Sequence, residues 1–191
     1  FQGGEQGLKD VHHASEMTGL FFDMINSYPK PVIMLAEGAA MAGGLGMLCA
    51  GDIVVVTEDC KFALTETTLG IPPAQIAPFV SQRIGLAKAR RIMLTAARFT
   101  GKEAHEMGLA DFVAKDADDL KVIEADIKKG VLKCAPGANA VTKEIVLATR
   151  HLTRKEMIEF AAKGFAERML SDEGKEGISS FIEKRKPKWS K

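Results

Sequence analysis

The chain has 191 residues, and its 26 Lys and Arg residues nearly balance its 25 Asp and Glu residues, for a formal net charge of +1. A chain of this length can bury a core of ordinary size, which predicts one domain or one domain with an appended helical piece. The balanced charge gives no field that would steer the protein toward nucleic acid or an acidic membrane. No segment reaches the roughly 18 uninterrupted apolar residues of a membrane span. Together with the balanced charge, this leads us to expect neither nucleic acid nor a membrane as partner.

The first part of the chain alternates between helical and extended patterns. Apolar residues recur at helical spacing over residues 8–27, and the prolines of segment 28–31 forbid continuation of that helix. The apolar run 32–36 then predicts a buried strand. The same reasoning predicts a short buried helix at 43–50, a β-branched strand at 52–57 and a shorter strand at 61–64.

A glycine-rich stretch, residues 37–46, joins the predicted strand 32–36 to the helix that follows. Gly43 and Gly44 let the backbone approach a ligand closely. The first N–H groups of a helix have no acceptor within that helix, so this turn can offer donors to an oxygen that becomes negative. The pattern therefore indicates an oxyanion hole.

From Pro78 onward the pattern becomes mainly helical. Helices are predicted at 79–84, 87–96 and 102–107, followed by a short strand at 111–114. The remainder is predicted as four helices, at 117–132, 138–150, 153–170 and 175–185. Breaks between them are expected at Gly137, at Ser171 and in the run 172–174. The basic segment 184–191 fits a solvated end, with a bound phosphate as the alternative.

Glu66 is the first choice for a catalytic carboxylate. It follows the predicted strand 61–64 and precedes the turn 70–73, where a rigid strand can hold a loop residue facing a cleft. The alternative is that Glu66 caps the following turn or pairs with a surface lysine, because most acidic residues are solvated.

Other reactive residues give no competing signal. The cysteines, Cys49, Cys60 and Cys134, lack ligand spacing, so we expect buried reduced thiols with no metal and no disulfide. His12 and His13 fall on the predicted solvated face of the first helix. No serine lies in a G-x-S-x-G setting, and neither a dinucleotide fingerprint nor a P-loop is present.

Short motifs extend along the whole chain: Lys30-Pro-Val, Glu37-Gly, Ala42-Gly-Gly, Gly51-Asp-Ile-Val, Phe62-Ala-Leu-Thr-Glu, Leu69-Gly, Arg83-Ile-Gly, Leu94-Thr, Ala104-His-Glu-Met-Gly-Leu and Glu176-Gly-Ile-Ser-Ser-Phe-Ile-Glu-Lys-Arg. In this order and spacing they resemble the enoyl-CoA hydratase/isomerase family, also called the crotonase family. The resemblance implies an α/β fold, a ββα spiral followed by a helical region used for trimer formation. It assigns residues 1–115 to a partial spiral core that carries the active site and residues 116–191 to the helical region. By the same resemblance the chain looks truncated at its N-terminus, where the family has the loop that donates the other oxyanion N–H.

Catalytic roles follow from the resemblance position by position. Gly43 matches the family's second oxyanion N–H donor, with Gly44 beside it, and Glu66 matches the general acid/base glutamate. Ala74 matches the backbone position that helps to hold the catalytic water in hydratases. No metal or prosthetic group is implied, because the thioester itself accepts the electrons.

The resemblance also implies how coenzyme A would bind as part of the substrate. Phe181 and Lys184 match residues that contact the adenine end of CoA, often from a neighbouring subunit. The expected partners are an acyl-CoA thioester and further copies of the chain in a homotrimer or hexamer. The default compartment is a bacterial cytoplasm, with the mitochondrial matrix as the alternative.

One position departs from the family pattern. Two-glutamate hydratases have a second carboxylate where this chain has Gly46, which cannot exchange a proton. The run Leu69 to Val80 looks like the branch acting on glutaconyl-type thioesters, so a hydratase is favoured. A Δ3,Δ2-enoyl-CoA isomerase needs only one glutamate and remains an alternative, as does a catalytically silent binding or assembly member of the fold.

The sequence leaves the acyl group open. The width of the acyl pocket depends on how four apolar residues pack: Met41, Leu45, Ile76 and Phe79.

Overall fold

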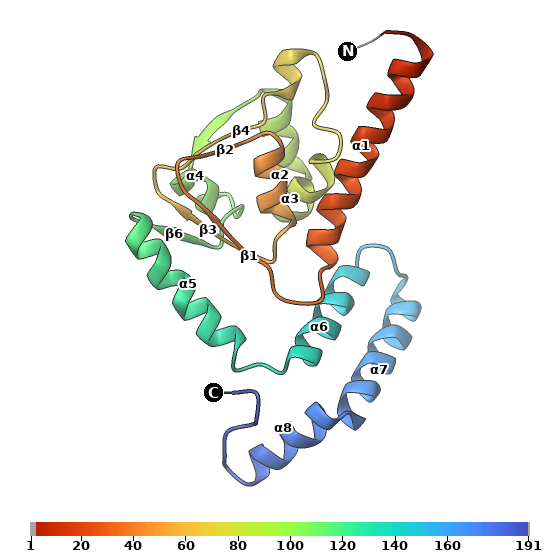
Figure 1. Cartoon of the computed structure of the whole chain (residues 1–191), viewed down its shortest axis with the longest axis vertical. Helices are drawn as coiled ribbons and strands as arrows, with labels where there is room; N and C mark the ends of the chain where they lie inside the picture. The colour runs from red at the N-terminus through yellow and green to blue at the C-terminus, as the bar shows by residue number, and fades with distance from the viewer. Residues whose placement is uncertain (1–2, 191) are drawn as a thin grey trace. The chain divides into compact units, whose positions relative to one another are not determined.

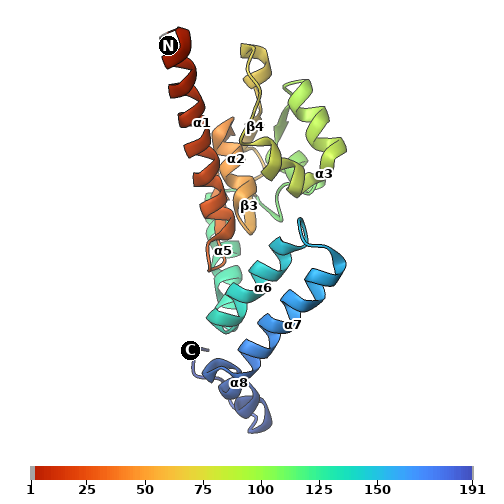
Figure 2. The ribbon, with the colours of Figure 1, turned by 90° about the vertical axis from the view of Figure 1, so that its right-hand side faces the viewer.

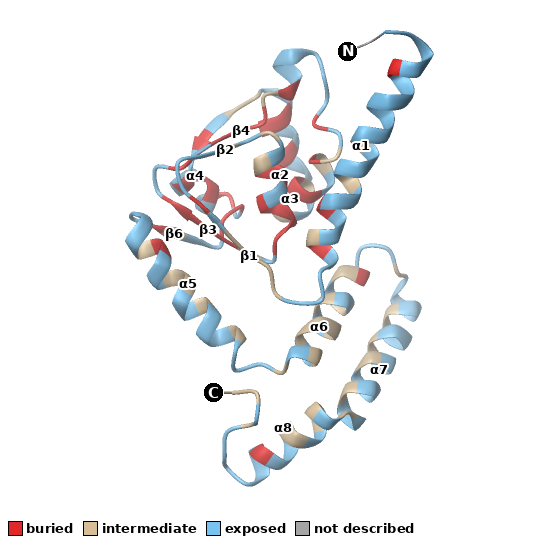
Figure 3. Ribbon diagram, viewed as in Figure 1, coloured by how far each residue is buried: buried red, intermediate tan, exposed pale blue. Residues whose placement is uncertain are grey.

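The computed structural model describes residues 3–190, which divide into two compact units (Figure 1). The first unit extends to Asn26 and resumes over Val32–Glu124, and the second holds Ser27–Pro31 and the residues from Ala125 onward. Within the described residues, no helix is both long enough and apolar enough to cross a membrane. Buried residues gather in the first unit, around its strands and the helices α2 and α3 (Figure 3).

The first unit contains two small three-stranded sheets. One has the order β1 (Ile33–Ala36), β3 (Ile53–Thr57), β6 (Phe112–Ala114), with both pairs parallel. Residues 54–56 of the central strand β3 are fully buried, as expected for a β-branched strand in a parallel sheet covered on both faces.

The second sheet has the order β2 (Ala39–Met41), β4 (Lys61–Ala63), β5 (Arg98–Thr100). β2 and β4 are parallel, whereas β4 and β5 are antiparallel. Across the antiparallel pair, the rings of Phe62 and Phe99 stack with their centroids 5.4 Å apart. The sequence did not predict β2 or β5, because β2 falls within the glycine-rich stretch 37–46 and β5 falls in the short interval between two predicted helices.

Helices pack around these sheets. α2 (Gly43–Ala50) is apolar throughout and largely buried. α3 (Ala77–Leu94) is kinked at Gly85, whose φ is 77°, which explains why the sequence predicted two helices here. The short helix α4 (Gly101–Glu106) follows β5, and its N-terminus is stabilised by a capping box between Thr100 and Glu103.

α1 (Gly4–Ser27) is a long helix along one side of the first unit (Figure 2). It is anchored by Phe22, whose ring meets that of Phe79 edge-on at a centroid distance of 5.8 Å. Most of the apolar residues whose spacing predicts the helix are nevertheless exposed, among them Met17, Leu20 and Met24. His12 and His13 are exposed as predicted.

The remaining helices follow the predicted series with two corrections. α5 (Ala117–Val131) contains the boundary between the units, and α6 (Pro136–Ala148), α7 (Arg154–Leu170) and α8 (Asp172–Ile182) lie in the second unit. Gly137 does not break the chain: it lies in the first turn of α6, after Pro136. The run 172–174 is likewise the first turn of α8, because Ser171 ends α7 and caps α8 with its hydroxyl.

The thiols differ in burial. Cys49 and Cys60 are buried, as predicted, but Cys134 is exposed just after α5. The prediction that all three are buried is therefore wrong for Cys134, whose apolar neighbours in sequence do not cover it.

Candidate active site

The parallel pair of β2 and β4 brings the glycine turn and the segment of Glu66 to one edge of the sheet. Met41 and Ala63, the last residues of the two strands, are register partners, and the N–H of Ala42 donates to the carbonyl of Ala63 at 3.0 Å. Paired strands lie about 4.8 Å apart. Gly43 begins α2 directly after this bond, and Glu66 begins the 3₁₀ turn η1 (Glu66–Leu69) shortly after β4. The two segments therefore start side by side.

The N-terminus of α2 offers open backbone donors. No side chain caps it, and the first backbone bond across its start runs from Gly46 N–H to Ala42 O, at 3.1 Å. The N–H groups of Gly43 and Gly44 precede that bond and have no acceptor in the helix. A β-carbon built on Gly43 would meet nothing within 4 Å. This helix start therefore has both the donors and the free space that a ligand oxygen needs.

Ala42 holds this turn in a strained conformation. It has φ 48° and ψ −121°, in the left-handed range that L side chains rarely adopt. Such strain costs on the order of 1–3 kcal/mol and is concentrated at functional sites. The sequence alone gave no sign of it, because alanine is an ordinary residue at most positions.

Glu66 is a buried carboxylate without a partner. The residue is 9% exposed, and neither carboxylate oxygen has a hydrogen-bond partner among the described residues. Burying a charge without a partner is costly, so such a group calls for a functional explanation. The alternative interpretation, a cap or an ion pair with a surface lysine, is wrong, because the side chain makes neither contact.

The backbone around Glu66 is held firmly. The hydroxyl of Thr67 donates to the carbonyl of Met93 at 3.1 Å, which ties η1 to the end of α3. Gly70 ends the turn with φ 76°, a left-handed conformation that suits glycine. The N–H of Ile71 then donates to the backbone carbonyl of Glu66 at 3.2 Å. The carboxylate is therefore the part of Glu66 left free for a ligand.

Ala74 lies in the exposed loop before α3, and its N–H donates to the carbonyl of Pro72 at 2.8 Å. A water bound to this N–H would compete with that bond. Its predicted role in holding water stays a prediction.

Gly46 is packed against Ile76. A β-carbon built on Gly46 would lie 2.9 Å from Cγ1 and 3.1 Å from Cγ2 of Ile76, distances that real β-carbons rarely or never show. The other residues predicted to set the pocket width divide into two groups: Leu45 and Phe79 are buried in the core, whereas Met41 is 38% exposed. Sequence reasoning identified the glycine but could not identify its neighbour.

Phe181 and Lys184 lie in the second unit, at the end of α8. Phe181 is 84% exposed, and its carbonyl accepts from the N–H of Lys184 at 3.2 Å. The next residue, Arg185, pairs with Glu176 at 2.6 Å, and this hydrogen bond lowers the pKa of Glu176 to about 2. Lys184 itself is exposed at a left-handed φ of 53°. Their contact with CoA stays a prediction.

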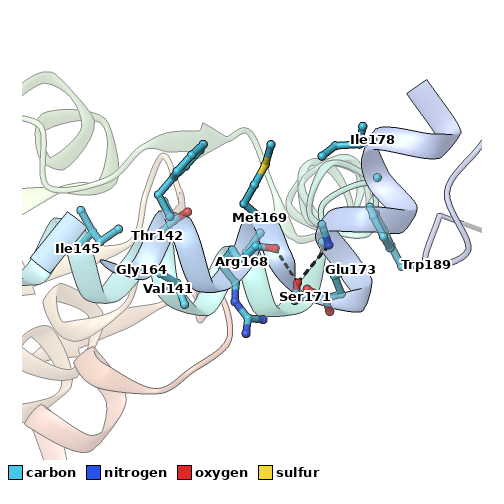
Figure 4. Close-up of a pocket in the computed structure, with 15 residues that line it drawn as sticks. Val141, Thr142, Ile145, Gly164, Arg168, Met169, Ser171, Glu173, Ile178 and Trp189 are labelled. Carbon is cyan, nitrogen blue, oxygen red and sulfur yellow. Dashed lines mark hydrogen bonds between the residues drawn. The ribbon is translucent and has the colours of Figure 1, made fainter. Parts of the chain in front are cut away.

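The second unit also has an apolar cavity of about 410 Å³ among α6, α7, α8 and Trp189 (Figure 4). Ser171 is one of the residues that line it, and its hydroxyl donates to the carbonyl of Arg168 at 2.7 Å. None of the residues predicted to carry chemistry lines this cavity.

The buried thiols are unsuited to catalysis. Burial raises the pKa of Cys49 to about 12 and that of Cys60 to about 11, so both remain protonated near neutral pH. Among residues 3–190, no group of three or more His, Cys, Asp or Glu side chains could hold a metal ion.

Comparison with known proteins identifies one family. The family model described as enoyl-CoA hydratase/isomerase matches residues 4–191. A probable enoyl-CoA hydratase of Bacillus subtilis is 33% identical over 186 residues, which cover 96% of this chain and 72% of the relative. The solved structure of Pseudomonas aeruginosa AtuE is 41% identical, with a TM-score of 0.92 over 98% of this chain and 72% of that one. An enoyl-CoA hydratase/isomerase of Marinobacter aquaeolei gives a TM-score of 0.94 at 36% identity, over 100% of this chain and 72% of that one.

Proposed function

The chain belongs to the enoyl-CoA hydratase/isomerase family, and we propose that it adds water to the double bond of a 2-enoyl-CoA thioester. The observation that carries the proposal is the unpartnered carboxylate of Glu66, buried on the segment that starts beside the open donors of Gly43. A proton-transfer group and an oxyanion site are the two parts that enolate chemistry on a thioester requires.

In the proposed reaction, the thioester carbonyl oxygen accepts a hydrogen bond from Gly43 N–H. Negative charge that reaches this oxygen as the enolate forms is then stabilised by a fixed backbone dipole. The loss of one such donor typically costs about 2.7 to 4 kcal/mol of barrier. Gly44 lies next along the helix and keeps the backbone accessible.

Glu66 moves the proton. As water oxygen bonds to the β-carbon, Glu66 accepts the water proton and the electrons of the double bond pass to the thioester oxygen. Glu66 then returns a proton to the α-carbon, which re-forms the carbonyl and leaves the 3-hydroxyacyl thioester. One carboxylate is enough for both transfers, which agrees with glycine at position 46. We place the water near Ala74.

Within this reaction class we propose a glutaconyl-type thioester, because the run 69–80 resembles the branch that acts on such substrates. The substrate's own distal carboxylate would then provide the second acidic group that Gly46 does not. No metal or prosthetic group enters the proposal, since coenzyme A arrives with the substrate. We further propose that Phe181 and Lys184 contact its adenine end in a homotrimer or hexamer, in a bacterial cytoplasm.

The second candidate is an isomerase that moves a double bond between the 3- and 2-positions. It is favoured by the same single carboxylate, which can remove a proton from one carbon and return it to another. A peroxisomal Delta(3,5)-Delta(2,4)-dienoyl-CoA isomerase of Arabidopsis thaliana is 31% identical over 166 residues, 85% of this chain and 59% of that relative.

The test offers the protein a glutaconyl thioester and a 3-enoyl thioester separately and identifies the products. We expect a 3-hydroxyacyl thioester from the first, seen as loss of the ultraviolet absorbance of the conjugated double bond. Conversion of the 3-enoyl thioester alone would replace the hydratase proposal with the isomerase. Binding of both without turnover would instead indicate a silent binding member of the fold.

A further inference from the structure

One face of the first turn of α2 is open at Gly43 and closed at Gly46. The two residues are three positions apart, so they lie on about the same face of the helix and differ by about 4.5 Å along its axis. A β-carbon on Gly43 would meet nothing within 4 Å, whereas one on Gly46 would run into Ile76. Side chains on a helix lean toward its N-terminus, so a β-carbon on Gly46 would lean toward the turn that starts at Gly43, and Ile76 is the residue that it would meet there.

From this arrangement we infer that Ile76 is a specificity-determining residue: it ends the open space beside Gly43 and limits the bulk of the acyl group that fits there. The inference rests on the proposed function, because it takes the space at Gly43 as the place of the thioester. It adds to that function the residue that selects among acyl groups.

Ile76 is well placed to act as a fixed wall. The residue is only 7% exposed, and its branched β-carbon leaves few side-chain rotamers. The next turn carries Phe79, which packs edge-on against Phe22 of α1. On the other side, the amide of Gln75 donates to the hydroxyl of Ser15 in α1 at 3.2 Å. Contacts with α1 therefore hold the chain on both sides of Ile76, so the side chain of Ile76 cannot move away to make room for a larger acyl group.

The side chain of Ile76 is also purely apolar, so it can discriminate among acyl groups only by their size. An apolar pocket distinguishes ligands that differ by one methylene by about 10- to 200-fold. Removing carbon atoms from Ile76 should therefore favour bulkier acyl groups over small ones. It should do so without affecting the contacts that any CoA thioester makes through its CoA part.

The test measures binding by calorimetry with two saturated thioesters, butyryl-CoA and the branched isovaleryl-CoA, so that no turnover is needed. The readout is the ratio of the two dissociation constants in the wild type, Ile76→Val and Ile76→Ala. We expect Ile76→Ala to shift this ratio at least 10-fold toward isovaleryl-CoA and Ile76→Val to shift it less in the same direction. Ile76→Val removes a single methyl group and keeps the branched β-carbon, so it covers the case in which the alanine variant does not fold.

Ile84→Ala is the matched control. Ile84 is the same residue type, is also 7% exposed and lies further along in α3. Its truncation should lower stability and leave the ratio unchanged. A ratio that stays constant in both Ile76 variants, or that shifts equally in Ile84→Ala, overturns the inference while the proposed function stands. A wild type that binds neither butyryl-CoA nor isovaleryl-CoA but converts the glutaconyl thioester overturns the inference alone, and one that also converts no enoyl thioester overturns both.

Discussion

The N–H of Ala42 donates to the carbonyl of Ala63 at 3.0 Å, and this one backbone bond aligns the two halves of the candidate site. Beyond Ala42 the chain enters α2 with open N–H donors, and beyond Ala63 it leads to the buried carboxylate of Glu66. Because both segments leave a parallel strand pair at the same edge, neither can move away without breaking the sheet. The arrangement supports a shared site in which the donors and the acid act on one substrate.

Replacing Glu66 with Gln separates chemistry from binding. The amide is nearly isosteric but cannot exchange a proton, so we expect kcat to fall by at least about 10²-fold. The dissociation constant for an acyl-CoA thioester should change little. We also expect no loss of thermal stability, since the substitution removes a buried charge that has no partner.

The control for this prediction is Glu37→Gln, the same change at an exposed position ahead of the glycine turn. It should leave kcat and stability unchanged. Turnover retained in Glu66→Gln would assign the proton transfer to another group.

Gly43→Ala tests whether the open space at the helix start is used. A β-carbon there meets nothing within 4 Å, so the protein should fold normally and gain about 0.4 to 1 kcal/mol in stability from the more restricted unfolded chain. The added methyl group would, however, occupy the space proposed for the thioester. We expect kcat/KM to fall by about 10-fold or more, since even small misplacement of reacting groups is costly.

Gly130→Ala in α5 is the matched variant, because its β-carbon also meets nothing within 4 Å. It should show the same gain in unfolding free energy with unchanged kinetics. Equal kinetics in the two variants would remove Gly43 from the site.

The sequence predicted the α/β crotonase fold, which the family match and the solved structures confirm. Long periodic helices such as 153–170 were predicted to within one residue, because apolar spacing repeats over several turns. Errors occurred where local signals were weak. Strand β2 falls within the glycine-rich stretch 37–46 and β5 in the short interval between two predicted helices, and Gly137 lies in the first turn of a helix rather than in a break.

The candidate site likewise has features that the sequence could predict and features that it could not. Glu66 could be selected from sequence because it follows a strand and precedes a turn. Its lack of a partner could not be predicted, since that depends on every neighbour in space. The contact between Gly46 and Ile76 was equally hidden, because it joins separate segments that only the packing of α2 against the start of α3 brings together.

The ion pair between Glu176 and Arg185 should make the C-terminal segment sensitive to acid. The hydrogen bond that the carboxylate of Glu176 accepts from Arg185 lowers the pKa of Glu176 from 4.5 to about 2 in the folded protein. A lowered carboxyl pKa means that the stabilisation is fully present above pH 4.5 and is lost as the pH falls toward 2. Trp189 reports on this segment, because its indole N–H donates to the carbonyl of Lys133.

We therefore expect the fluorescence of Trp189, the single tryptophan, to change over that acid range in the wild type. In Glu176→Gln the change should be absent from that pH window, because the titrating group is gone. An identical transition in both proteins would assign the acid response to other carboxylates.

Lys184→Glu tests the proposed contact with coenzyme A. Lys184 is exposed at the end of α8, so charge reversal there should not affect folding. If its ammonium group meets the phosphates or the adenine end of CoA, a carboxylate at this position repels them, and KM should rise by about 10-fold while kcat changes little.

Lys186→Glu makes the same charge change at a neighbouring exposed position and should have a much smaller effect on KM. Because added salt screens exposed charges, the difference between the two variants should narrow at high ionic strength. Equal KM values for Lys184→Glu and the wild type would take the end of α8 out of the binding site.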